Sequence, residues 1–162
     1  MIVPDASFVA MRPAVPEDLD TLAAIDARCF PAGIVYSKKE IATLLHTSTA
    51  LTLVAQRSQT IVGYASLRLL PQRRFPHRAQ RGELITIDVL PEFRREGVGR
   101  QLHQALEDWL CERRGDSIEL HVAIDNTAAL RFYQHLGYRI IARVPQYYLE
   151  TIDAWRMEKI LR

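Results

Sequence analysis

The chain has 162 residues, an apolar content of 48% and a formal net charge of +2. These values are typical of an ordinary soluble globular protein, and we predict a single domain spanning residues 1–162. A charge so close to balance gives no indication of a nucleic-acid or membrane partner.

Cysteine usage and apolar runs predict the compartment. Cys29 and Cys111 are far apart and form no C-x-x-C motif, so we expect two reduced thiols. No apolar run is long enough to cross a bilayer, and the N-terminus lacks the basic-then-apolar pattern of a signal peptide. We therefore expect a cytoplasmic protein without membrane attachment, either a monomer or a homodimer.

Local signals predict where several elements begin. Pro16-Glu17-Asp18 opens a helix, because proline suits the first turn and acidic side chains suit its positive end. Ser37 and Glu40 form a capping box for a second, short helix. Residues 117–124 alternate apolar and polar side chains, which predicts a strand whose more polar face carries Glu119, His121 and Ala123.

The remaining elements follow from periodicity and from glycine and proline positions. In chain order we predict a strand at 8–13, a helix from Pro16, a loop at 30–37, a helix from Ser37 to about His46, hairpin strands at 51–56 and 61–70, a loop at 71–82, a strand at 83–90, a helix at 95–114, a strand at 117–124, a helix capped by Asn126 or Asp125 that runs to about Leu136, and strands at 138–144 and 154–161. This order predicts an α/β fold, a mixed sheet with helices on both faces.

The loop at 71–82 is rich in basic side chains: Arg73, Arg74, His77, Arg78 and Arg81. The plain interpretation is a solvated loop. The alternative is a contact with an acidic protein or an RNA acceptor.

A candidate anion site lies between the predicted strand at 83–90 and the following helix. Gly97 and Gly99 allow a ligand to approach the backbone closely, where the first turn of a helix exposes unpaired N–H groups. Arg94, Arg95 and Arg100 flank that turn. The combination predicts a site for phosphate groups.

Other phosphate motifs fit this stretch less well. The sequence has no G-x-x-x-x-G-K-[ST], which excludes a P-loop nucleotide enzyme at the level of the motif. Leu102 stands where a dinucleotide fingerprint requires glycine or alanine. A basic helix start, with glycines present only for packing, is the remaining alternative.

Two longer motifs carry a family resemblance. Residues 89–102, VLPEFRREGVGRQL, resemble motif A of the GNAT superfamily of N-acetyltransferases, with its R/Q-x-x-G-x-G/A core. Residues 126–138, NTAALRFYQHLGY, resemble motif B of the same superfamily. The resemblance covers essentially the whole chain, and two motifs at the usual separation make chance an unlikely source.

This resemblance implies a GNAT fold: a mostly antiparallel sheet of about six or seven strands, splayed between the strands at 83–90 and 117–124. It also implies an acyltransferase that uses acetyl-CoA, releases CoA and needs no metal. The backbone of Ile87, Asp88 and Val89 would pair with the pantetheine, and a backbone N–H, that of Val89, would polarise the thioester oxygen. The other implied coenzyme contacts are Arg94, Arg95, Glu96, Gly97, Val98, Gly99, Arg100, Asn126 and Tyr133.

The resemblance also implies catalytic roles. Tyr133 matches the family tyrosine that lies near the coenzyme sulfur, where it would hydrogen-bond the leaving thiolate. His121 matches the histidine of one group of these enzymes, and imidazole can accept a proton near neutral pH. Glu83 could share or replace that role, and Glu119 is a weaker candidate. Ordinary structural roles, a core tyrosine and a surface histidine, are the alternatives.

Within the superfamily, the chain is most similar to protein Nα-acetyltransferases of the RimI and NatE catalytic-subunit types. The likeness is carried by Phe30-Pro31, by Leu120-His121-Val122 and by Gln146-Tyr147-Tyr148. It implies an acceptor groove formed by Phe30, Pro31, Tyr36, Tyr147 and Tyr148, whose alternative role is loop packing. The chain departs from these enzymes in its longer loop at 71–82 and in inserted residues between Pro31 and Tyr36.

Proton energetics bear on the acceptor. Deprotonating an α-ammonium group at pH 7 costs about 1.4 kcal/mol, against about 4.6 kcal/mol for lysine. A histidine base therefore favours the α-amino group of a protein or peptide. A small amine, a lysine side chain or an aminoacyl-tRNA stays open as acceptor, and so does a CoA-binding regulatory module without turnover.

Overall fold

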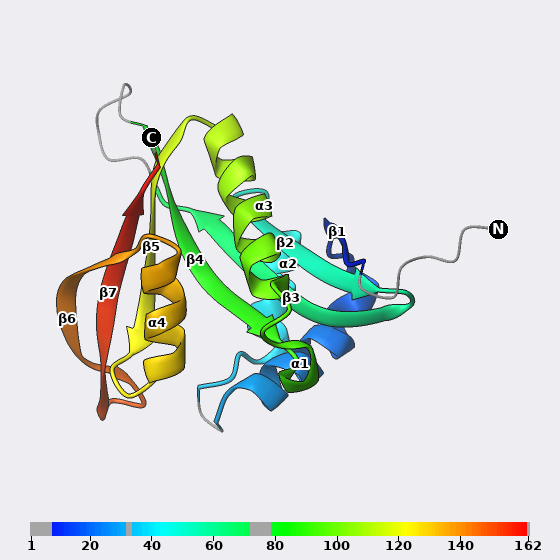
Figure 1. Ribbon diagram of the computed structural model, residues 1–162, viewed down its shortest axis with the longest axis horizontal. Helices are drawn as coiled ribbons and strands as arrows, with labels where there is room; N and C mark the ends of the chain where they lie inside the picture. The colour runs from blue at the N-terminus through cyan, green and yellow to red at the C-terminus, as the bar shows by residue number, and fades with distance from the viewer. Residues whose placement is uncertain (1–7, 32–33, 72–78, 162) are drawn as a thin grey trace. The chain divides into compact units, whose positions relative to one another are not determined.

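The computed structural model describes residues 8–31, 34–71 and 79–161. The helices and strands in chain order are β1 (Ala10–Pro13), the 3-10 helix η1 (Pro16–Asp18), α1 (Leu19–Cys29), α2 (Lys38–His46), β2 (Ala50–Arg57), β3 (Thr60–Leu69), β4 (Gln80–Val89), the 3-10 helix η2 (Pro91–Phe93), α3 (Val98–Glu112), β5 (Gly115–Ala123), α4 (Thr127–His135), β6 (Arg139–Tyr148) and β7 (Ile152–Ile160). The strands form one mixed, mostly antiparallel sheet in the order β1-β2-β3-β4-β5-β7-β6 (Figure 1).

The chain divides into two compact units. The first comprises Met1–Arg68 and Ile85–Leu106, and the second comprises Leu69–Leu84 and Glu107–Arg162. Strand β4 and helix α3 each contribute residues to both units. Among the described helices, none is both long enough and apolar enough to cross a membrane.

The first unit contains the hairpin of β2 and β3, with β1 paired antiparallel to β2. Helices α1 and α2 pack together, and α2 begins at the predicted capping box, where the Ser37 side chain accepts from the Glu40 N–H. The buried core of this unit consists of Leu22, Ile25, Ile41, Val54, Tyr64 and Leu90. Gly63 lies against β4, since a Cβ atom there would be 2.6 Å from the Asp88 carbonyl oxygen.

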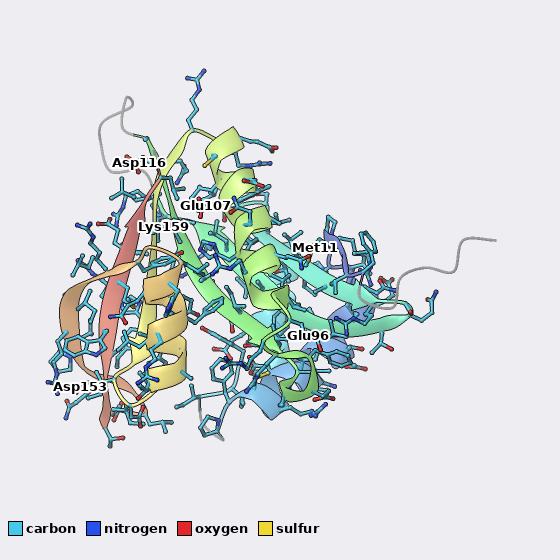
Figure 2. The ribbon with its side chains drawn as sticks, in the orientation of Figure 1. Met11, Glu96, Glu107, Asp116, Asp153 and Lys159 are labelled. Carbon is cyan, nitrogen blue, oxygen red and sulfur yellow. The ribbon has the colours of Figure 1, made fainter. Side chains whose placement is uncertain are left out.

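In the second unit, β5 pairs antiparallel with β7, and β7 pairs antiparallel with β6. The residues at the start of β4, Gln80–Glu83, pair in parallel with β5. The alternation predicted for β5 is confirmed: Ile118, Leu120 and Val122 are buried, whereas the residues between them are half-buried. Lys159 of β7 forms an ion pair with Glu107 of α3, 2.5 Å apart, and both side chains are labelled in Figure 2.

The predicted α/β fold class is confirmed, with three corrections to element limits. Strand β4 begins at Gln80, inside the predicted loop, because this residue pairs with Gly115 and its side chain donates to the Leu70 carbonyl. Helix α3 begins at Val98 rather than at residue 95, because the residues just before it take positive φ values. Strand β6 runs on to Tyr148, past Pro145, through a shift in register against β7.

Candidate functional site

The turn before α3 has the conformation that an anion site requires. Arg95 and Gly97 have φ values of +64° and +83°. The first i to i−4 bond of α3 runs from the Gln101 N–H to the Gly97 carbonyl, so the preceding amides of the helix start have no such partner. A Cβ atom at Gly97 would meet nothing nearer than the Gln101 Nε2 atom at 3.9 Å, so the space beside it is open.

The residues flanking this turn fit a diphosphate. Arg94, Arg95 and Arg100 are exposed, and Val98 is buried, which anchors the helix start. Open space beside a glycine, amides at a helix start and guanidinium groups together supply donors and positive charge for an anion. The geometry is therefore compatible with the phosphate site predicted at Arg94 to Arg100.

The end of β4 is tied to this turn. The Arg94 Nε atom donates to the Val89 carbonyl at 2.8 Å, and the Cys29 thiol donates weakly to the same oxygen at 3.5 Å. Burial raises the pKa of Cys29, with Asp88 adding to the shift, so this thiol stays protonated near neutral pH. The predicted roles of Ile87 and of the Val89 N–H toward the coenzyme stay predictions.

A contact that the sequence did not indicate holds the same turn from β2. Arg57 Nη2 lies 2.5 Å from the Glu96 carboxylate, and the guanidinium lies 5.2 Å from the Phe93 ring centroid. Glu96, labelled in Figure 2, stands between the two positive-φ residues. Glu96 was predicted as a coenzyme contact, and in the structure it forms an ion pair with Arg57. Arg57 lies beside Glu96 in space but is distant from it in sequence, so no local pattern in the sequence indicated this contact.

The first unit also contains three residues of the predicted acceptor groove: Phe30, Pro31 and Tyr36. Phe30 is the C-cap of α1 and is half-buried, and Pro31 is exposed. Tyr36 is half-buried and fixed at both ends: its N–H donates to Asp26 at 2.6 Å and its hydroxyl donates to the Ile85 carbonyl at 3.3 Å. Tyr36 is therefore held against β4 rather than loosely packed in a loop.

In the second unit, three predicted residues come together on β5 and β6. The rings of His121 and Tyr147 stack in parallel, with centroids 4.3 Å apart and planes inclined by 6°. The Tyr148 hydroxyl donates to the His121 carbonyl at 3.1 Å, and its ring meets that of Tyr147 edge to face. This cluster joins the candidate base to two candidate acceptor residues.

A bulge in β6 makes this cluster possible. The register against β7 shifts between Val144 and Tyr148, and Gln146 takes a φ of +53°. Asp153 of β7, labelled in Figure 2, accepts from the Gln146 N–H at 2.9 Å and from Arg143 at 2.7 Å. The bulge changes which way Tyr147 and Tyr148 face, as bulges do. Nothing local in the sequence pointed to Asp153.

Two carboxylates and a guanidinium act electrostatically on the imidazole of His121. Burial lowers the pKa of His121, and Arg156 lowers it further, whereas Glu83 and Glu119 oppose the shift. Glu119 forms an ion pair with Arg81, a basic residue of the predicted loop at 71–82. Arg73, Arg74, His77 and Arg78 lie outside the described residues. The lowered pKa keeps His121 neutral at pH 7, the form that accepts a proton.

Tyr133 lies on α4, which begins at the predicted cap: the Asn126 side chain accepts from the Ala129 N–H at 3.2 Å. Tyr133 is half-buried, and its ring meets that of Tyr138 edge to face, with the ring centroids 5.7 Å apart. Tyr138 is more deeply buried, at 3% exposure. Tyr138 is therefore a core residue, and its burial raises the pKa of its hydroxyl. The predicted coenzyme role of Asn126 stays a prediction beside its observed role as a helix cap.

Residues 19–138 match the acetyltransferase (GNAT) family. The match is to most of the chain, so this protein belongs to that family, as its two motifs predicted. The chain is 26% identical over 152 residues to an N-alpha-acetyltransferase of Sulfurisphaera tokodaii, covering 91% of this chain and 90% of that protein. It is 36% identical over 76 residues to N-alpha-acetyltransferase 30 of Schizosaccharomyces pombe. That second match covers 47% of this chain and spans about half, 51%, of the relative's length.

Solved structures resemble the fold. The crystal structure of ribosomal-protein-alanine N-acetyltransferase from Brucella melitensis superimposes with a TM-score of 0.76 at 26% identity, covering 94% of this chain and 99% of that one.

Proposed function

We propose that this member of the acetyltransferase (GNAT) family is an acetyl-CoA-dependent Nα-acetyltransferase, which transfers an acetyl group directly to the α-amino group of a protein or peptide. The observation that carries the proposal is the His121–Tyr147 stack, with Glu83 and Glu119 acting on the imidazole. The similarity to relatives named N-alpha-acetyltransferases supports the same acceptor class. We also propose that the enzyme is cytoplasmic and that its reaction needs no metal.

The turn at Arg94–Arg100 would bind the donor's diphosphate through backbone amides and guanidinium groups. When bound, acetyl-CoA supplies an acetyl thioester, an activated acyl group with a thiol leaving group. The backbone of Ile87 to Val89 would hold the pantetheine arm as an added strand and offer the Val89 N–H to the thioester oxygen. Tyr133 would hydrogen-bond the departing sulfur.

On the acceptor side, His121 would take the proton that an α-ammonium group must lose. Its pKa is held below the ordinary value by burial, so the imidazole is neutral at pH 7. Glu83 and Glu119 supply negative charge that favours a cationic amine nearby. Because lysine costs about 3 kcal/mol more to deprotonate at pH 7, this modest base favours an α-amine.

Free-thiol release from acetyl-CoA tests the acceptor class with a matched pair of peptides. One peptide has a free α-amine and no lysine, and its partner has a blocked N-terminus and one lysine in the same sequence context. We expect thiol release and a single acetyl group at the N-terminus, by mass spectrometry, with the first peptide only. Turnover of the blocked lysine peptide at equal or higher rate would reject the α-amine, and acetyl-CoA binding without thiol release from any amine would reject the enzyme.

A further inference from the structure

Two carboxyl groups with no place in the chemistry above are buried together in the first unit. Asp26 of α1 is 0% exposed and Asp88 of β4 is 1% exposed. Their carboxyl groups are in hydrogen-bonding contact with each other, and both contact the hydroxyl of Tyr64, itself 1% exposed. Two ionised carboxylates in such a place would repel each other and lack solvation.

The donors around the pair locate a proton. Asp26 accepts from the Tyr36 N–H at 2.6 Å on Oδ2 and from the Tyr64 hydroxyl at 3.2 Å on Oδ1, which suits an ionised carboxylate. Asp88 accepts from the Thr86 hydroxyl at 3.0 Å on Oδ1. Its Oδ2 atom is buried, and no N–H or O–H group of the described residues donates to it. Because the two carboxyl groups are in hydrogen-bonding contact and this oxygen has no donor, a proton carried on Asp88 Oδ2 would supply the missing hydrogen bond.

The electrostatics agree with this assignment. Burial, followed by the Asp26 carboxylate, raises the pKa of Asp88 well above its usual value. The pKa of Asp26 is raised by burial as well, whereas the bonds from Tyr36, Asp88 and Tyr64 lower it. The other titratable groups that act on the pair are Glu40 of α2 and the Cys29 thiol of α1.

The contacts of Asp26 lead to the acceptor side. Its Oδ2 atom holds the backbone of Tyr36, whose hydroxyl in turn bonds the Ile85 carbonyl of β4. Asp88 lies on the same strand, three residues after Ile85. The next residue, Val89, accepts hydrogen bonds from Arg94 and Cys29 on its carbonyl oxygen. One buried contact therefore joins the loop after α1 to the strand predicted to line the donor.

We propose that Asp88 donates a proton from Oδ2 to the Asp26 carboxylate, and that this pair is a positioning element that fixes Tyr36 against β4 for binding of the acceptor peptide. The assignment of Tyr36 to the acceptor rests on the proposed function. The two carboxyl groups contact neither substrate, although the backbone of Asp88 belongs to the strand proposed to hold the pantetheine. The effect of the pair on the acceptor passes through the backbone of Tyr36.

The kinetic test compares Asp88→Asn with Asp88→Ala. An asparagine amide donates to Asp26 as a protonated Asp88 does, whereas alanine leaves the Asp26 carboxylate without that donor. We expect Asp88→Ala to raise the peptide KM about tenfold more than it raises the acetyl-CoA KM, and Asp88→Asn to restore most of that loss. Equal peptide KM values in the two variants would overturn the positioning role.

A second measurement needs no turnover and stands if the proposed function fails. Asp88 has a raised pKa when folded, so its contribution to stability is complete at pH below about 4 and is lost as pH rises toward the folded pKa. Within that window, the unfolding equilibrium constant of the wild type should rise relative to Asp88→Asn by up to about tenfold per pH unit. Parallel stability profiles would show that Asp88 holds no proton.

Infrared spectroscopy at neutral pH makes the same test directly. The difference spectrum of wild type minus Asp88→Asn should contain the carbonyl stretch of a protonated carboxyl group. A spectrum with carboxylate bands alone would overturn the assignment of the proton, even if Asp88→Ala fails to fold and the kinetic comparison cannot be made.

Discussion

Replacing Gly97 by glutamate should strongly weaken acetyl-CoA binding with only a modest loss of stability. The side chain would enter the open space beside the turn, where the nearest atom to a Cβ is Gln101 Nε2 at 3.9 Å. A non-glycine residue at the φ of +83° costs about 1–2 kcal/mol. For a chain of this size, that lowers Tm by roughly 2–8 °C.

The loss of affinity has a separate size. A carboxylate about 4 Å from a phosphate repels it by about 1 kcal/mol in water and about 4 kcal/mol in a partly screened protein site. An intermediate value of about 2–3 kcal/mol corresponds to a roughly 30- to 150-fold rise in Kd for acetyl-CoA. Because salt screens part of this repulsion, the loss should be smaller at high ionic strength.

Two control variants separate charge from backbone strain. Gly97→Gln has nearly the same size and the same φ as Gly97→Glu but no charge, so the difference between their Kd values isolates the repulsion. Gly137→Gln places a side chain at a φ of +95° after α4, where a Cβ would again meet only ordinary contacts. Isothermal titration with CoA should show the order wild type, Gly97→Gln, Gly97→Glu, with Gly137→Gln near wild type. Tight CoA binding by Gly97→Glu would refute the site at this turn.

Three further outcomes follow from the second unit. Tyr133→Phe should lower kcat about 10- to 100-fold while the Kd for acetyl-CoA stays within about twofold, because one hydrogen bond to a charged sulfur is lost; an unchanged kcat would remove Tyr133 from the mechanism. His121→Ala should abolish the acidic limb of the pH profile of kcat/KM. In the wild type the midpoint of that limb should lie below about pH 6.5, because burial lowers the pKa of His121. The control variant His46→Ala, at an exposed histidine, should keep the acidic limb. Asn126→Ala should lower the free energy of unfolding by about 1 kcal/mol in denaturant titrations, because the α4 cap is lost. An unchanged free energy of unfolding would show that water replaces the cap as partner of the Ala129 N–H.

The parts of the fold that local chemistry determines were predictable from the sequence. The capping box at Ser37 and the cap at Asn126 depend on bonds to backbone three residues away, and both are observed. The alternation along β5 predicted which face carries His121. Element limits were less predictable where long-range pairing decides them, as at Gln80, which joins β4 through its bond to Leu70 and its pairing with Gly115.

The site was predictable where a motif reports a backbone shape, and not where a contact joins distant segments. Gly97 marked the turn before α3, but nothing in the sequence indicated that Arg57 would hold Glu96. Asp26 gave a faint signal, a lone acid within the apolar stripe of α1. Its partner Asp88, 62 positions later, reads as a polar residue in a strand until the fold places both in one core.

Of the described non-glycine residues with positive φ, Arg95 and Gln146 lie beside proposed ligand contacts. Positive φ at Ser58 and Arg114 falls in tight connections between elements, as expected of turns. Arg95 lies in the turn between η2 and α3, Gln146 lies within β6, and each positive φ costs about 1–2 kcal/mol. Ion pairs oppose that cost, Arg57 with Glu96 beside the first and Arg143 with Asp153 beside the second. The strain at both places gives no stability but accompanies a particular geometry. At Arg95 this is a helix start whose amides suit an anion, and at Gln146 it is a bulge beside the rings stacked on His121.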